Sequence, residues 1–213
     1  MSDDCCSGKQ IELERVAGRA GQRRVLVTVL AINAAMFLLE FSVGLIAGSA
    51  ALMADSVDMM GDALVYGLSI YALERSHRWK AGAAMAKGFF ILAFGVAVIA
   101  DIMIKLKSGV PPSSPLMAGM GAVARVANLV CLRLLWRFRA LDVNMASTFE
   151  CSRNDVISNV GVLAAAGLVA VTGQAWPDLI IGAIIAAVFL RSALRVIRAS
   201  WRELRARQMT GAW

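Results

Sequence analysis

Two aspartates one helical turn apart, Asp58 and Asp62, interrupt the apolar segment 50–73. An ionised carboxylate inside a membrane costs about 3 kcal/mol or more, so intramembrane acids usually face a bundle interior or a water-filled cavity. There they mark the path of a substrate, an ion or a proton. Cys151 and Asp155 repeat the same spacing at the start of another apolar segment. Together, these residue types at this spacing predict a metal site.

Helical spacing explains how four such residues can meet. Residues four apart lie on one helix face, so two helices can direct two ligands each at one point. Zinc prefers four ligands and accepts carboxylate oxygen, imidazole nitrogen or thiolate sulfur. A structural ion pair is the alternative for Asp58 and Asp62, but segment 50–73 contains no Lys or Arg. Cys151 can instead be a small buried apolar residue, although its register with Asp155 favours a ligand.

The elements that must position these residues follow from composition. The chain has 213 residues and 59% of them are hydrophobic, which exceeds the apolar share of soluble domains. A membrane-spanning helix needs roughly 20 apolar residues. The sequence therefore predicts an all-α, polytopic membrane protein with six transmembrane helices. Their expected ranges are 25–47, 50–73, 86–106, 115–136, 147–171 and 177–198.

Three parts are expected along the chain. Residues 1–24 are a cytosolic N-terminal segment, 25–198 a six-helix transport domain, and 199–213 a short basic cytosolic tail. The N-terminal segment lacks the basic start and short apolar core of a secretory signal. Lys and Arg gather at one end of the expected helices, which indicates two cytoplasmic termini in a bacterial inner or plasma membrane. Anionic lipid explains the basic tail better than nucleic acid does, so no nucleic-acid partner is expected.

Residues 48–62 resemble the signature of a known family. The run Gly-Ser-Ala-Ala-Leu-Met-Ala-Asp-Ser-Val-Asp-Met-Met-Gly-Asp is similar to that of the cation diffusion facilitator family. The family pattern has Ser, small and aliphatic residues, Asp, then His or Asp, three residues, and Asp. The resemblance covers roughly residues 24–200. It implies a six-span antiporter of divalent metal and protons, with a site shared by the second and fifth spans. The residues that match this site are Asp58, Asp62, Cys151 and Asp155.

The chain departs from the family pattern in two places. Most members have His-x-x-x-Asp in the fifth span, where this sequence has Cys151 and Asp155. Thiolates favour soft ions, so the expected cargo is zinc or cadmium before manganese, and no prosthetic group is expected. The family's soluble C-terminal domain is also expected to be absent. Any homodimer would then form through the transmembrane helices.

Polar residues around the expected site suggest a supporting role. Glu40 and Asn33 in the first span, and Asn128 in the fourth, fall where the resembling family usually has polar residues. We expect Glu40, Asn33, Asp55 and Asn159 to support the ligands through hydrogen bonds or to carry protons. An alternative for Asp55 is that it caps the polar entrance of the cavity.

Cys5 and Cys6 form a second candidate metal-binding group. Adjacent thiols near the N-terminus could capture a soft metal and deliver it to the cavity. An unstructured terminus and a lipidated cysteine pair are the alternatives.

These observations predict metal cation efflux by proton antiport. The expected partners are a metal cation, protons and the lipid bilayer. Two other functions remain open, namely a non-transporting membrane metal sensor or subunit, and a soft-metal importer. An enzyme is not expected, because no nucleophile and base pair, phosphate-binding loop or cofactor motif stands out.

Overall fold

The computed structural model describes residues 3–72, 77–139 and 143–210, with side chains described for part of these ranges. These residues form six α-helices, so the protein is an all-α polytopic membrane protein, as the sequence predicted. The helices are α1 (Asp3–Ala47), α2 (Ala50–Ala72), α3 (His77–Ser108), α4 (Ser114–Trp136), α5 (Val143–Thr172) and α6 (Trp176–Thr210).

Each predicted span corresponds to one helix. Five helices of the described residues contain a stretch long and apolar enough to cross a membrane, at Gly21–Ala47, Gly88–Ser108, Ser114–Trp136, Ser152–Thr172 and Trp176–Arg195. The remaining helix, α2, has 23 residues and carries three aspartates, which lowers its apolar character. Several helices continue past the apolar stretch, since α1 begins at Asp3 and α6 ends at Thr210.

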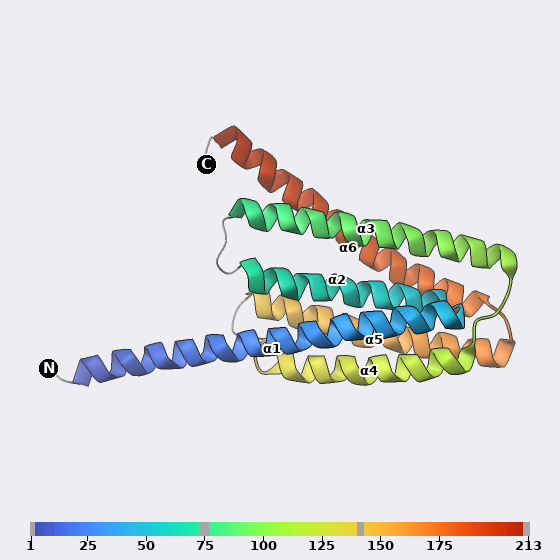
Figure 1. The fold of residues 1–213 in the computed structure, drawn as a ribbon, viewed down its shortest axis with the longest axis horizontal. Helices are drawn as coiled ribbons and strands as arrows, with labels where there is room; N and C mark the ends of the chain where they lie inside the picture. Colours follow the sequence, from blue (N-terminus) through green and yellow to red (C-terminus); the bar gives the residue numbers. More distant parts are fainter. Residues whose placement is uncertain (1–2, 73–76, 140–142, 211–213) are drawn as a thin grey trace.

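Helix α2 is enclosed by its neighbours. It packs against α1, α3, α5 and α6, and Figure 1 shows it running through the middle of the bundle. Residues 50–57 of α2 are all buried. The other extensive pairings are α3 with α6 and α4 with α5. A helix in this position contacts protein on nearly every side, so its buried Asp55 and Asp62 do not face lipid.

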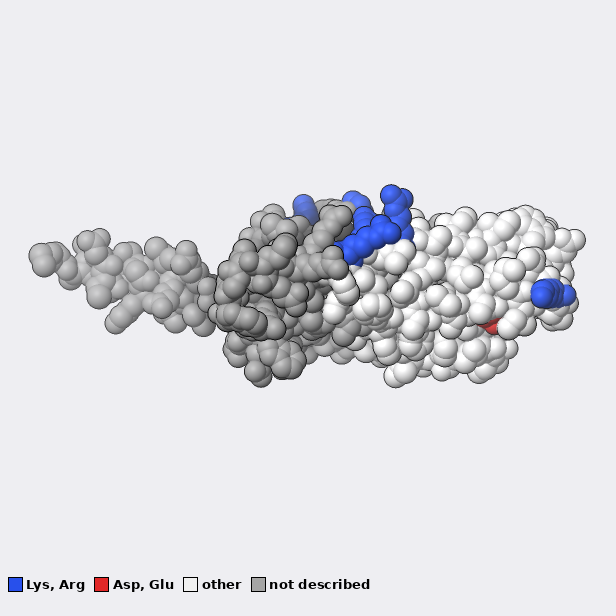
Figure 2. Space-filling model, turned by 90° about the horizontal axis from the view of Figure 1, so that it is seen from above, with Lys and Arg blue, Asp and Glu red and all other residues white. Residues whose placement is uncertain are grey.

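Apolar side chains cover the outside of the bundle. Large hydrophobic residues that are more than half exposed occur on several helices, among them Leu38, Ile104, Val126, Val171 and Val188. In Figure 2 a broad zone without Lys or Arg separates the cationic side chains beside the grey region from the one at the far end of the molecule. This surface suits the hydrocarbon core of a bilayer.

Three tight turns close one end of the bundle. Gly48, Gly109 and Gly173 follow α1, α3 and α5, and each has a positive φ of 64–68°. The N–H groups of Gly109 and Gly173 donate to the carbonyls of Lys105 and Val169, at 3.0 and 2.8 Å, which satisfies the helix ends. Both ends of the described chain lie at the opposite end of the bundle (Figure 1).

Helices α2 and α6 approach each other closely at Gly182. A Cβ atom on this residue would lie 2.8 Å from the carbonyl carbon of Ala50 and 3.0 Å from the backbone nitrogen of Ala51. Backbone atoms cannot move aside as a flexible side chain can. Glycine at this position therefore lets the two helix backbones touch.

We predict that Gly182→Ala destabilises the protein. The added methyl group must push α6 away from α2, which typically costs about 1–3 kcal/mol in a well-packed interior. Gly167→Ala is the matched control, because a Cβ there would meet nothing within 4 Å. Thermal unfolding in detergent should show a lower Tm for Gly182→Ala and no loss for Gly167→Ala. Equal Tm values for the two variants would contradict the close backbone contact.

Candidate metal centre

Three aspartates of α2 point into the bundle at helical spacing. Asp55 and Asp62 are 1% and 7% exposed, whereas Asp58 is partly exposed. Asp155 of α5 is 3% exposed. It interacts electrostatically with the carboxyl groups of α2 and α1, in decreasing order Asp62, Asp58, Asp55 and Glu40. The structure thus brings the acids of the second and fifth spans into one region of the interior.

These carboxyl groups are not gathered at coordination distance. Among the residues with described side chains, no group of three His, Cys, Asp or Glu is close enough to hold a metal ion. The side chain of Cys151, one helical turn before Asp155 in α5, lies outside the described residues. The side chains of Cys5 and Cys6 in α1 do so as well.

A chain of polar side chains crosses the bundle beside these acids. Asn159 of α5 donates from Nδ2 to Oδ2 of Asp55 at 2.5 Å, and its Oδ1 accepts from Nδ2 of Asn128 in α4 at 3.0 Å. All three residues are buried. Asn159 therefore links α2, α4 and α5 through groups that could not remain unpaired in an apolar interior without a large penalty.

Glu40 extends this chain to α1. The residue is fully buried and interacts with the neighbouring carboxyl group of Asp55. Neither oxygen of Glu40 receives a hydrogen bond from a donor among the described residues. Ionised carboxylates can only accept hydrogen bonds. A hydrogen bond between Glu40 and Asp55 therefore requires a proton on one of them.

A buried thiol lies close to the same acids. Cys131 of α4 is fully buried, and its sulfur lies 3.9 Å from Nδ2 of Asn33, which also donates to the carbonyl of Val29. Cys131 interacts electrostatically with Asp155 and Asp62. Nothing in the sequence placed this cysteine near the acids, because no His, Cys, Asp or Glu lies three or four residues from it.

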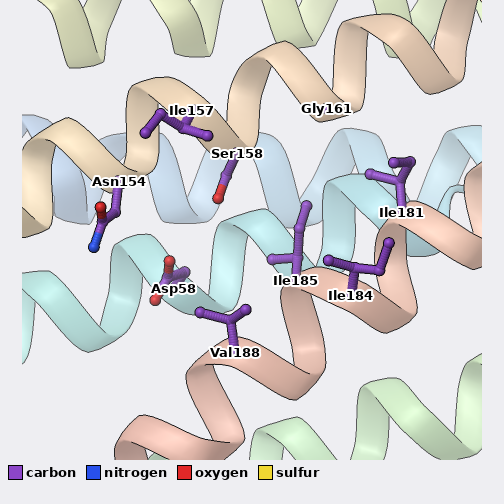
Figure 3. A pocket seen from close by; sticks show the side chains of 9 residues that line it. All are labelled: Asp58, Asn154, Ile157, Ser158, Gly161, Ile181, Ile184, Ile185 and Val188. Atoms are coloured by element: carbon purple, nitrogen blue, oxygen red, sulfur yellow. The ribbon is translucent and has the colours of Figure 1, made fainter.

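A pocket of about 380 Å³ reaches Asp58 between α2, α5 and α6. Figure 3 shows Asn154 and Ser158 of α5 on the side facing Asp58, with Ser158 pointing toward α2. Apolar residues complete the lining, namely Ile157, Gly161, Ile181, Ile184, Ile185 and Val188. Because α5 and α6 run in opposite directions, Asn154 and Val188 mark the end of the pocket nearer to the chain termini. A small ion can thus reach Asp58 from outside the core through this pocket.

Sequence reasoning also missed a polar contact between the first turns of α2 and α6. Asp178 of α6 is 1% exposed and accepts hydrogen bonds from Ser49 and from two N–H groups of α2. The available signals were a serine before a helix start and an acid in the first turn of another helix. Neither signal indicates that Ser49 and Asp178 contact each other.

Comparison with known families matches residues 26–205 to the cation efflux transmembrane domain. The chain belongs to the cation efflux family. This match covers most of the chain, and it confirms the resemblance to the cation diffusion facilitators seen in residues 48–62.

Two relatives of this chain illustrate the similarity. It is 25% identical over 197 residues to the metal cation efflux system protein CzcD of Cupriavidus metallidurans, which covers 83% of the chain. It is 23% identical over 194 residues to the zinc transporter ZitB of Escherichia coli, which covers 85% of the chain. In both cases the match spans 62% of the relative's length.

We predict that Asn159→Leu destabilises the interior of the bundle. Leucine has a similar volume, but it removes the donor to Asp55 and the acceptor for Asn128. A buried polar group left without its partner typically costs about 1–3 kcal/mol. Asn154→Leu is the control, because Asn154 lies on the same helix and is exposed. A lower Tm in detergent is expected for Asn159→Leu alone, and equal Tm values would exclude this role.

Proposed function

We propose that this chain exports a divalent heavy-metal cation, zinc or cadmium, in exchange for protons. The observation that carries the proposal is the convergence of Asp62, Asp58 and Asp155 from α2 and α5 inside an apolar bundle. The names of the relatives, a metal cation efflux protein and a zinc transporter, support the same class of function. Transport, and no enzymatic reaction, is the activity that such a site serves.

The proposed ligands are Asp58, Asp62, Cys151 and Asp155. Three carboxylates and one thiolate provide four donors and enough negative charge to offset the desolvation of a divalent ion. The entering cation would draw the carboxyl groups of α2 and α5 toward one point. Binding would thereby change the packing of α2 against α5, which is the kind of differential contact that a transport cycle requires.

The type of ligand favours soft cations. A thiolate prefers zinc, cadmium and similar ions over manganese or magnesium, which prefer oxygen ligands alone. The cation is cargo, and no resident prosthetic group is part of the proposal. Cys5 and Cys6 are proposed to capture the ion before it enters the cavity.

Proton coupling follows from the same groups. Metal binds the deprotonated carboxylate and thiolate, so protons and metal compete for the ligands, and binding of one releases the other. Glu40 and Asp55 are proposed to carry a proton between them, because neither Glu40 oxygen has a described donor. Asn159 donates to Asp55, and Asn33 donates to Cys131. Both asparagines would support the proton path.

The pocket beside Asp58 is the proposed entry. Asn154 and Ser158 offer oxygen atoms on the way to Asp58, and the polar part of the lining lies toward the end with both termini. That end also carries most of the Lys and Arg in the sequence, which favours a cytoplasmic position. We therefore propose a bacterial inner or plasma membrane location with cytoplasmic termini, and homodimers formed through the transmembrane helices.

Metal flux in proteoliposomes tests this function. We predict that zinc uptake into vesicles with an acidic lumen exceeds uptake at equal pH on both sides, because protons leaving the lumen drive metal inward. Asp62→Ala should reduce uptake to the level of empty vesicles. Asp101→Ala is the matched control, since Asp101 pairs with Lys105 on α3, away from α5.

The outcomes separate the rival functions. Full flux in Asp62→Ala would refute the assigned site. Stoichiometric zinc binding without any flux would favour a sensor or subunit. Cells that become more sensitive to zinc or cadmium when they produce the protein would indicate an importer, whereas an exporter protects them.

A further inference from the structure

The carboxyl group of Asp178 holds the first turn of α2. Its Oδ1 accepts from Ser49 Oγ at 2.6 Å and from the N–H of Ala51 at 3.1 Å, and its Oδ2 accepts from the N–H of Ala50 at 2.7 Å. The next N–H, of Leu52, donates to Ser49 Oγ at 3.1 Å. The N–H groups that a helix start leaves without partners are thereby satisfied in a buried setting.

The same carboxyl group serves two helices. Asp178 lies in the first turn of α6, where a negative charge is favourable, and it binds the first turn of α2, where the same preference applies. Both helices begin at the end of the bundle opposite to the termini and run in the same direction (Figure 1). One buried carboxylate thus ties two parallel helix starts together.

One turn further along α6, the two helices touch through their backbones. Gly182 packs against Ala50, and no larger residue fits without moving the backbone. Beyond this point α6 contributes Ile185 and Val188 to the pocket that reaches Asp58. The contact between α2 and α6 is therefore tight at its start and gives way to a cavity along its length.

We propose that Asp178 is a positioning residue that fixes the start of α2, so that Asp58 lies at the pocket and opposite α5. Asp58 lies eight residues after Ala50, which is about 12 Å along the helix axis. A shift or fraying of the first turn of α2 would displace Asp58 relative to α5 and α6.

The expected effect on zinc binding rests on the proposed function, whereas the contacts of Asp178 with the first turn of α2 do not. Hydrogen exchange at residues 48–53 and equilibrium zinc binding are therefore measured separately on the whole protein in detergent. The variants are Asp178→Ala, which removes all three contacts, and Asp178→Asn, which keeps one carbonyl oxygen as acceptor. Asp101→Asn is the control, because it removes a carboxyl group from the Lys105 pair and leaves the start of α2 intact.

Asp178→Ala should lose exchange protection at Ala50 and Ala51 and bind zinc about 3- to 30-fold more weakly, the range that the loss of a helix N-cap typically produces in an equilibrium constant. Asp178→Asn should show a smaller loss of both, and Asp101→Asn should match the wild type. If Asp178→Ala does not fold, Ser49→Ala, which removes the hydroxyl contact alone, should lose part of the protection and affinity.

Three results would overturn the proposal. Wild-type exchange protection in Asp178→Ala would show that Asp178 does not hold the first turn of α2. Lost protection with wild-type zinc affinity would make Asp178 a purely structural cap. Equal weakening of zinc binding in Asp178→Asn and Asp101→Asn would indicate a general effect of charge at this end of the bundle. Failure of metal flux in the wild type would refute the proposed function without touching these measurements of binding and exchange.

Discussion

Two buried aspartates and a third that faces a pocket, all on one transmembrane helix, require that neighbouring helices enclose it. Helix α2 meets this requirement by packing against α1, α3, α5 and α6. A carboxylate exposed to lipid would cost several kcal/mol, while one inside the bundle can be paired, protonated or neutralised by a cation. In this structure Asp55 accepts a hydrogen bond from Asn159, Glu40 lies beside Asp55, and Asp58 faces a pocket.

The two halves of α2 have different surroundings. Its first turn is fixed by Asp178 and by backbone contact with Gly182, which leaves little freedom for movement. Further along, the cavity beside Asp58 separates α2 from parts of α5 and α6. In the proposed mechanism, a fixed start followed by a cavity would let α2 and α5 approach each other when a cation binds. The hydrogen bonds from Asp55 through Asn159 to Asn128 link α2, α5 and α4.

The sequence predicted the six helices and the burial of the acids, because both depend on local composition and spacing. The helix ends were harder to predict, because α1 and α6 continue through charged segments. A prediction based on apolar stretches leaves such segments out. Contacts between distant residues could not be predicted. Asp178 lies 129 positions from Ser49, and whether it meets α2 depends on how α6 is rotated and crossed. The proximity of Cys131 to Asp155 depends on the same geometry.

The central claim is that α2 and α5 bind one divalent cation through carboxylates and a thiolate. X-ray absorption spectroscopy of protein loaded with one zinc per chain tests it most directly. We predict one sulfur at about 2.3 Å and oxygen ligands at about 2.0–2.2 Å, with the sulfur lost in Cys151→Ser. A shell of oxygen and nitrogen alone in the wild type, or a sulfur that persists in Cys151→Ser, would contradict the account.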